Sequence, residues 1–247
     1  MSEVWSVGAY EQLAGAHDGL IERLAPVPGE HWLDLATGTG EIALRAAAAG
    51  ARVTALDVVP PLLEKARRGA EQAGLEITFD LGDVEYLPYE DSCFDVVASS
   101  FGLILAPDHA NVAAELARVS CSGARLGFTA WRPDPKLGNL YRGFSEEPIE
   151  GREAYEWGRE DHVESMLGDH FELEFVDGTL LLEAESPEAV WDLFSTSAAP
   201  LVTLLGRLDE DRREELHRAF VKHFEGYLQD GRVRAPRRYL LVLGRRH

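Results

Sequence analysis

Two acidic residues and a pair of glycines form the part of this chain best suited to bind a ligand. Asp34 lies in a short apolar segment, and Gly38 and Gly40 follow it. Because glycine lacks a Cβ, the backbone there can approach a ligand closely. Asp57 ends the next apolar segment, where an acid in an open α/β sheet accepts hydrogen bonds from ribose hydroxyls. The spacing therefore predicts a nucleotide-like ligand that carries a ribose.

The elements that position these residues alternate between strands and helices. Apolar segments predict strands at 32–35, 53–56, 77–79, 92–100, 126–131, 171–182 and 239–243. Apolar residues at helical spacing predict helices at 9–25, 42–48, 60–73, 108–120 and 187–230. This alternation predicts a mostly parallel sheet with helices on both faces, whose ligands bind beyond the carboxyl ends of the strands.

Two later stretches carry less regular patterns. Residues 132–168 are rich in Pro, Gly and charged residues, which is typical of a long functional loop over a site. The strand predicted at 171–182 contains Asp177 and Gly178, where it could be interrupted.

The glycine motif alone leaves the ligand open. Residues 38–43 also fit the dinucleotide fingerprint G-x-G-x-x-G/A, and Asp57 would serve an NAD(P)-dependent oxidoreductase equally well. Asp34, however, would repel a pyrophosphate, whereas it suits the α-amino group of a methionine moiety. The chain also has no obvious Tyr-x-x-x-Lys proton relay.

Further motifs separate these alternatives. Gly82–Pro88 follows the third predicted strand, and Ser92–Ser100 forms the fourth. Together with the glycine motif and Ala55–Val58, this ordered series over residues 31–131 resembles the class I S-adenosylmethionine (SAM) dependent methyltransferases. The resemblance implies a Rossmann-like, doubly wound α/β fold of seven strands, mostly parallel with the last strand antiparallel, plus a helical substrate cover. It also implies that a methyl group moves from SAM to a small-molecule acceptor by in-line displacement, with S-adenosylhomocysteine as product.

The resemblance assigns roles around the cofactor by position. It places one group of residues around the methionine end: Asp34, Ala36, Thr37, Gly38 and Gly40. Members of the family often have Gly at the position of Ala36. The same resemblance implies that Ser99 and Ser100 contact the carboxyl and amino groups of the methionine, and that Tyr10 closes over the cofactor.

The adenosine end is assigned in the same way. Asp57 resembles the ribose-binding acid, with Val58 beside the adenine, and Asp83 resembles the acid that accepts from the adenine amino group, with Val84 adding backbone contact. Simpler structural roles stay open, since Asp57 could cap the helix near Pro60 and Asp83 could be a turn residue.

The acceptor side is less sharply marked. Phe101 and Trp131 follow the fourth and fifth predicted strands, where the transferred methyl should lie, so we expect them to line the substrate pocket. His109 is a weak candidate for a general base, because its ordinary pKa suits proton transfer, yet a solvated first-turn histidine is the simpler interpretation. The residues also predict no metal site, since Cys93 and Cys121 lie in no metal-binding spacing.

Composition limits the partners. With 43 acidic against 24 basic residues the net charge is −19, which disfavours nucleic acid as a partner. The start of the chain does not resemble a secretory signal, and no stretch has the length of a membrane span, so a cytoplasmic enzyme without a membrane partner is expected.

The predicted organisation has three parts. Residues 1–30 form an amino-terminal helical cap, residues 31–131 the SAM-binding core, and residues 132–247 the rest of the sheet (about 171–182 and 235–244) with cover segments (about 132–168 and 187–230). A SAM-binding protein without catalysis is a further alternative. The methyl acceptor and the oligomeric state are left open by the sequence.

Overall fold

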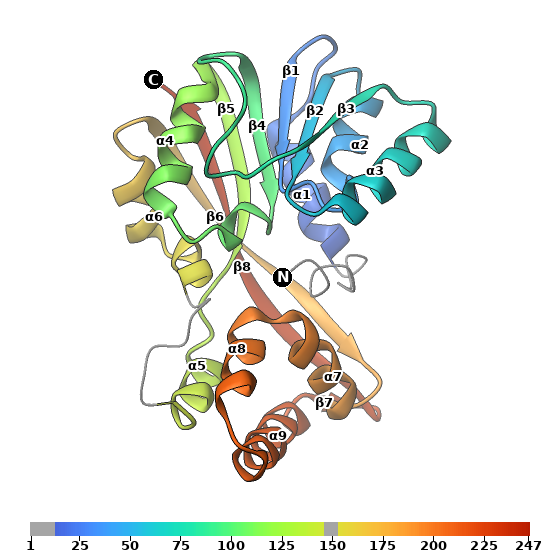
Figure 1. Cartoon of the computed structure of the whole chain (residues 1–247), viewed down its shortest axis with the longest axis vertical. Helices are drawn as coiled ribbons and strands as arrows, with labels where there is room; N and C mark the ends of the chain where they lie inside the picture. Colours follow the sequence, from blue (N-terminus) through green and yellow to red (C-terminus); the bar gives the residue numbers. More distant parts are fainter. Residues whose placement is uncertain (1–12, 146–152) are drawn as a thin grey trace.

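One twisted sheet organises the chain in a computed structural model, which describes residues 13–145 and 153–247 (Figure 1). Its strands are β1 (His31–Leu35), β2 (Arg52–Asp57), β3 (Ile77–Leu81), β4 (Phe94–Ser100), β5 (Ser120–Trp131), β6 (Phe171–Ala184), β7 (Leu228–Gln229) and β8 (Arg232–Arg246). They lie in the order β3-β2-β1-β4-β5-β8-β6, and the short β7 pairs with β8. The pairs among β1 to β5 are parallel, whereas β8 is antiparallel to β5 and β6. The predicted Rossmann-like α/β sheet with an antiparallel last strand is confirmed.

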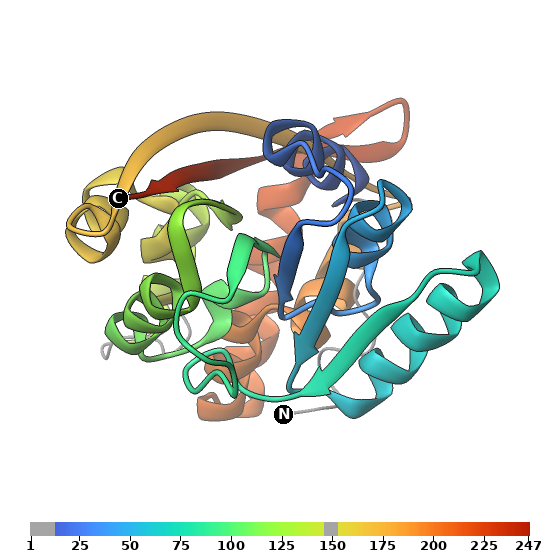
Figure 2. The same ribbon diagram turned by 90° about the horizontal axis from the view of Figure 1, so that it is seen from above.

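Helices cover both faces of this sheet. The described helices are α1 (Ala14–Leu24), α2 (Glu41–Ala48), α3 (Pro60–Ala73), α4 (His109–Val119), α5 (Pro135–Arg142), α6 (Glu160–Leu167), α7 (Pro187–Ser197), α8 (Ala199–Arg207) and α9 (Glu210–Glu225), with short 3₁₀ segments η3 (Leu103–Leu105) and η4 (Glu153–Gly158). On one face α1 packs on α2 and α2 on α3, while α4 and α6 pack together on the other (Figures 1 and 2). A Cβ at Gly127 of β5 would lie 2.8 Å from Leu20 and from Leu24, so α1 lies directly on that strand.

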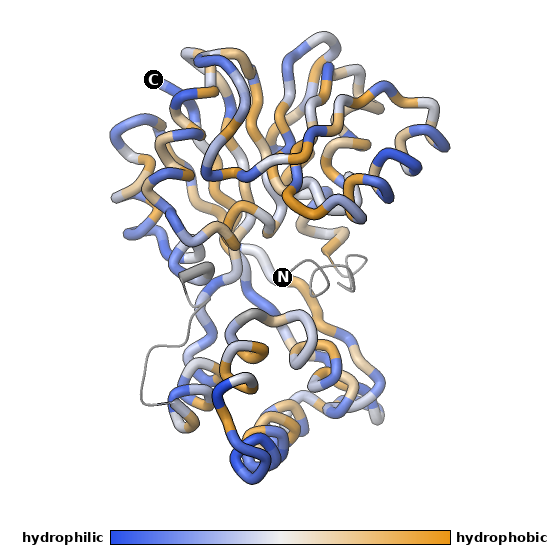
Figure 3. The backbone as a smooth tube through the Cα atoms, in the orientation of Figure 1, coloured by the Kyte–Doolittle hydropathy of each residue, from blue (hydrophilic) through white to orange (hydrophobic). Residues whose placement is uncertain are grey.

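The two longest strands, β6 and β8, extend beyond the main sheet into a second unit (Figure 1). We call α5, α7, α8 and α9, together with the far halves of β6 and β8, the helical unit. Its buried apolar side chains form a cluster separate from the core of the main sheet: Tyr141, Leu182, Val190, Phe194, Leu201, Leu204, Leu216, Phe220, Phe224, Val233 and Ala235. Figure 3 shows hydrophobic segments along the inner strands and hydrophilic segments on the outer turns of α9. Two strands therefore carry a second small core beside the main one.

Local sequence signals explain where several helices begin and end. The carboxylate of Asp108 accepts from the N–H of Asn111 at 3.0 Å and caps α4, as predicted. Gly74 ends α3 with φ at 66°, as the sequence also predicted. Within the described residues, no single helix has the length and apolar composition to cross a membrane. Two consecutive helical segments, Pro187–Ser197 and Pro200–Arg207, have that length and composition only when they are counted together, and the chain bends sharply between them.

The structure corrects two expectations. Residues 132–168, expected as a long loop, contain α5, η4 and α6 in their described part. Trp157 of η4 and Val163 and Leu167 of α6 are buried in the main core, and Tyr141 of α5 is buried in the core of the helical unit. β6 runs through Gly178 without interruption. Gly178 lies opposite Tyr239 of β8, and a Cβ at Gly178 would lie 2.1 Å from Cζ of that ring, so the glycine makes room for the tyrosine.

Candidate active site

The turn between β1 and α2 brings the first group of predicted residues to the carboxyl edge of the sheet. Three of its residues have positive φ: Ala36 at 50°, Gly38 at 57° and Gly40 at 87°. Glycine adopts such angles freely, whereas the Cβ of Ala36 makes this conformation costly. The N–H of Thr37 donates to the carbonyl of Leu56 at 3.0 Å and holds this glycine turn (residues 36–40) against the end of β2.

Asp34 is buried beneath the glycine turn. Its Oδ2 accepts from the Thr37 hydroxyl at 2.6 Å and from the N–H of Ala43 at 3.0 Å, so it ties the turn to the first part of α2. Burial raises the pKa of this carboxyl to about 7, and the nearby Asp57 contributes in the same direction. An ammonium group beside Asp34 would restore the charged form.

Asp57 joins the two turns at the ends of β1 and β2. Its Oδ2 accepts from the N–H of Gly38 at 2.8 Å, and its Oδ1 accepts from the N–H of Val59 at 2.9 Å. The α3 helix begins after Val59 without a side-chain cap, so Asp57 does not act as the cap of that helix. The carboxylate is instead fixed at the point where both turns meet.

Exposed apolar side chains lie next to Asp57. Val58 follows Asp57 directly and is 64% exposed. Leu81, the register partner of Asp57 on β3, is 63% exposed. Asp83 is exposed, and its Oδ1 accepts from the N–H of Glu85 at 3.0 Å, which is the turn role that the sequence left open. Val84 is buried. A flat apolar ring bound at this edge would cover side chains that otherwise face water.

The two serines at the end of β4 differ in their surroundings. Ser99 is fully buried, donates to the carbonyl of Leu35 at 2.7 Å and accepts from the N–H of Leu103 at 3.0 Å. It therefore holds η3 against β1. Ser100 is half-buried, and its hydroxyl lies 3.2 Å from that of Thr129.

Phe101 and Trp131, the two residues predicted for the acceptor, are in direct contact. Their rings stack with centroids 4.1 Å apart and an angle of 19° between the planes. The ring of Tyr239 meets Phe101 edge-on at 5.8 Å. Trp131 and Tyr239 are register partners on β5 and β8, so the structure brings three aromatic rings together at the strand ends.

The remaining predicted residues are placed differently. Tyr10 lies outside the described residues. His109 begins α4, and its Nδ1 lies 2.9 Å from Nε2 of His162. Its ring also lies 4.9 Å from that of Trp157, which packs on Phe128 of β5. His109 is thus part of the packing between α4, α6 and η4.

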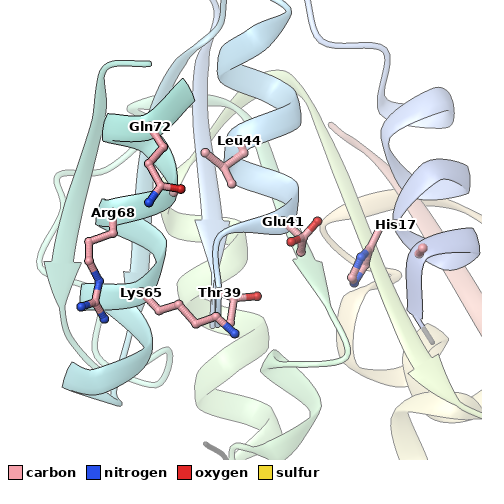
Figure 4. A pocket seen from close by; sticks show the side chains of 9 residues that line it. His17, Thr39, Glu41, Leu44, Lys65, Arg68 and Gln72 are labelled. Atoms are coloured by element: carbon pink, nitrogen blue, oxygen red, sulfur yellow. The ribbon is translucent and has the colours of Figure 1, made fainter. Parts of the chain in front are cut away.

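A hollow of about 720 Å³ lies beside the glycine turn, between α1, α2 and α3 (Figure 4). Its lining residues are Ala14, His17, Thr39, Glu41, Leu44, Lys65, Arg68, Gly69 and Gln72. It meets the glycine turn through Thr39 and the start of α2 through Glu41, and it does not include Asp57, Asp83 or Ser100. The hollow therefore lies between helices, apart from most of the predicted strand-end residues.

Three residues at the site were not singled out from the sequence. Thr129 accepts from the N–H of Phe101 through its Oγ1 at 3.1 Å, and Tyr239 supplies the third ring. A Cβ at Gly102 would lie 2.4 Å from Cβ of Ala36, so the turns after β1 and β4 touch at this glycine. A glycine directly after a strand-end aromatic was the one local signal for this contact.

Known proteins resemble this chain over most of its length. Residues 33–123 match the family model described as "Methyltransferase domain". An uncharacterized protein of Mycobacterium tuberculosis (strain ATCC 25618 / H37Rv) is 30% identical over 246 residues, which cover 92% of this chain and 88% of that protein. The demethylmenaquinone methyltransferase of Thermus thermophilus is 44% identical over 114 residues, 44% of this chain and 52% of that enzyme. The chain belongs to the class I SAM-dependent methyltransferases.

The fold is shared with solved structures, among them a "putative methyltransferase" from Bacillus halodurans C-125 with a TM-score of 0.65 at 21% identity, covering 94% of this chain and 98% of that one. The crystal structure of the YcgJ protein from Bacillus subtilis superposes with a TM-score of 0.63 at 17% identity, covering 95% of this chain and 99% of that one. Membership replaces the alternative of an NAD(P)-dependent oxidoreductase and makes SAM the cofactor. The strand-end residues fit that group, since Asp34 offers a buried carboxylate for an ammonium and Val58 and Leu81 offer exposed apolar surface for an adenine.

Proposed function

We propose that this methyltransferase transfers the methyl group to a small molecule bound against Phe101 and Trp131. The observation that carries this proposal is the stack of their rings at the ends of β4 and β5. A planar or apolar acceptor would lie against this stack, between the main sheet and the helical unit. The stack is largely closed to water, because Phe101 is buried and Trp131 half-buried.

The proposal assigns each part of the cofactor to residues of the strand ends. Asp34 would hold the methionine ammonium, and Asp57 would accept from the ribose hydroxyls. Val58, Asp83 and Val84 would lie around the adenine. For the methionine carboxyl we favour Ser100 over Ser99, because the hydroxyl of Ser99 is already used by two backbone groups. The role of Tyr10 stays a prediction.

The chain contributes mainly position and shielding to the reaction. When bound, SAM supplies an activated methyl on a sulfonium, so the acceptor needs only to be aligned with it and kept from water. The aromatic stack orients the acceptor, and Thr129 fixes the backbone of Phe101 beneath it. His109 is engaged with His162 and Trp157, so we assign it no proton transfer and expect an acceptor that needs no protein base.

The test combines binding and turnover. Calorimetric titration with S-adenosylhomocysteine, NADH and NADPH should show binding of the first alone. Trp131→Leu should then keep the affinity for S-adenosylhomocysteine within about threefold and lower the transfer of labelled methyl to a panel of small acceptors by tenfold or more. Trp191→Leu is the matched control, since the ring of Trp191 packs against His217 and edge-on against Phe220 within the helical unit. Equal loss of turnover in both variants would remove the acceptor assignment.

A further inference from the structure

Arg237 continues the aromatic stack toward the helical unit. It lies two residues from Tyr239 on β8 and therefore on the same face of the sheet. Its guanidinium carbon is 4.0 Å from the ring centroid of Trp131 and 5.1 Å from that of Phe194 on α7. Phe101, Trp131, Arg237 and Phe194 thus form one row of neighbouring planar groups from the end of β4 to the helical unit. We call these four residues the planar row.

The charge of Arg237 has no carboxylate partner among the described residues. The two neighbouring arginines on β8 do have one: Arg234 lies 3.1 Å from Glu183, and Arg238 lies 3.5 Å from Asp177. Asp134, whose charge influences Arg237, uses its Oδ1 to cap α5 through two backbone N–H groups. In a chain with 43 acidic residues, a half-buried guanidinium that pairs with none of the described ones suits an anion from outside.

A second unpartnered donor lies beside it. Tyr141 of α5 is 6% exposed, and within the described part of the chain its hydroxyl has no hydrogen-bond partner. It is close enough to Arg237 for the two groups to influence each other electrostatically. Burial raises the pKa of Tyr141, so its hydroxyl stays a neutral donor. A buried hydroxyl without a partner costs stability unless a ligand accepts from it.

The geometry points to a carboxylate on the methyl acceptor, bound by Arg237 and Tyr141 while the rest of the acceptor lies against Phe101 and Trp131. This inference rests on the proposed function. The rings of Trp131 and Phe194 lie close to the guanidinium carbon, and its N–H groups are paired with no described carboxylate, so they are available to a ligand. A planar carboxylate can accept two parallel hydrogen bonds from a guanidinium. The substrate class is therefore an apolar or aromatic monocarboxylic acid.

The test uses three probes that share a naphthalene ring: 2-naphthoate, the planar and uncharged 2-naphthamide, and the tetrahedral dianion 2-naphthyl phosphate. Each is titrated by ligand-observed NMR, with and without saturating S-adenosylhomocysteine. The carboxylate should bind at least tenfold more tightly than the amide and more tightly than the phosphate. Arg237→Met should weaken carboxylate binding at least tenfold, and Tyr141→Phe should weaken it about two- to fivefold. Arg238→Met, the matched control, should leave it within twofold.

A second readout separates recognition from a structural role. Among the described residues Arg237 has no carboxylate partner and the Tyr141 hydroxyl has no hydrogen-bond partner, so neither substitution breaks an ion pair or hydrogen bond seen there. Arg237→Met and Tyr141→Phe should therefore keep the melting temperature nearly unchanged while they weaken carboxylate binding. Equal binding of carboxylate and amide, preference for the phosphate, or equal effects of Arg237→Met and Arg238→Met would overturn the inference. Normal binding of S-adenosylhomocysteine in that case would leave the proposed function standing. Carboxylate binding without any binding of S-adenosylhomocysteine would remove the proposed function and keep the carboxylate site.

Discussion

The N–H of Gly38 donates to Oδ2 of Asp57 at 2.8 Å, so the glycine turn is anchored by the same carboxylate that is predicted to bind ribose. The other oxygen holds the turn before α3 through Val59 at 2.9 Å. One side chain thus joins two turns that are predicted to bind different parts of the cofactor. A change at this position is expected to alter binding and stability together.

Replacing Asp57 with Ala should show both effects. The affinity for S-adenosylhomocysteine should fall by about 1–3 kcal/mol, the range for a lost charge-assisted hydrogen bond. Two backbone N–H groups also lose their acceptor, so the free energy of unfolding should fall by about 1–2 kcal/mol. Calorimetry and urea denaturation measure the two quantities. Unchanged cofactor affinity would remove the ribose assignment, even if stability fell.

The affinity for S-adenosylhomocysteine should depend on pH through Asp34. Its pKa lies at about 7 in the ligand-free protein, and a bound ammonium favours the carboxylate, so binding should weaken as the pH falls below about 7. Titration of one group can weaken the affinity by at most about tenfold per pH unit. Titrations from pH 6 to 8.5 in buffers of different ionisation enthalpy should also detect release of a proton on binding. Asp34→Asn should bind more weakly at pH 8 and show a flat profile, and a flat profile in the wild type would contradict the assignment.

The same raised pKa should make the ligand-free protein less stable as the pH rises, whereas the affinity for S-adenosylhomocysteine rises with pH. A carboxyl whose folded pKa exceeds its unfolded value stabilises the fold when protonated, and this contribution is lost as the pH rises from about 4 to about 7. Asp34→Asn removes the buried charge and keeps an oxygen for Thr37 and Ala43. The variant should therefore gain stability relative to the wild type at pH 8 and little at pH 4. Urea denaturation at both pH values gives the difference, and equal differences would contradict the raised pKa.

Arg118 should stabilise the turn that follows Asp83. Its guanidinium donates to Glu115 at 2.6 and 2.8 Å and to the carbonyls of Leu87 and Tyr89 at 3.0 and 2.7 Å. Arg118→Met should lower the free energy of unfolding by about 2–3 kcal/mol at pH 7, because several charge-assisted bonds are lost. The guanidinium also lowers the pKa of Glu115, so this contribution is lost as the pH falls through that pKa. Arg67→Met, which removes an exposed pair with Glu64, is the control and should have an effect below about 1 kcal/mol.

Gly102 should not tolerate a side chain. A Cβ there would lie 2.4 Å from Cβ and 2.7 Å from the carbonyl oxygen of Ala36, so Gly102→Ala should displace the glycine turn. We expect at least tenfold weaker binding of S-adenosylhomocysteine and a lower melting temperature. Gly138→Ala is the matched control, because nothing lies within 4 Å of its Cβ and alanine favours the α5 helix by roughly 0.5–1 kcal/mol. Equal behaviour of the two variants would refute the close contact.

The sequence by itself determined the elements of the main sheet and the acids at its strand ends. Asp34 and Asp57 could be placed because a parallel strand, a tight turn and a helix follow one another locally, and the carboxyl ends of parallel strands share one edge. Phe101 and Trp131 could be matched for the same reason. The turn role of Asp83 and the cap at Asp108 also depend on neighbours a few residues away.

Only the tertiary structure decided the far side of the site. Arg237 meets Trp131 and Phe194 because β8 lies between β5 and β6 in the sheet, and no local pattern encodes that placement. Within 132–168, α6 packs through Val163 and Leu167 in the main core and α5 through Tyr141 in the core of the helical unit, although their surroundings in the sequence are polar. Asp57 likewise accepts from both Gly38 and Val59 only because the turns after β1 and β2 meet in space. Contacts between distant segments are set by packing, which a short stretch of sequence does not contain.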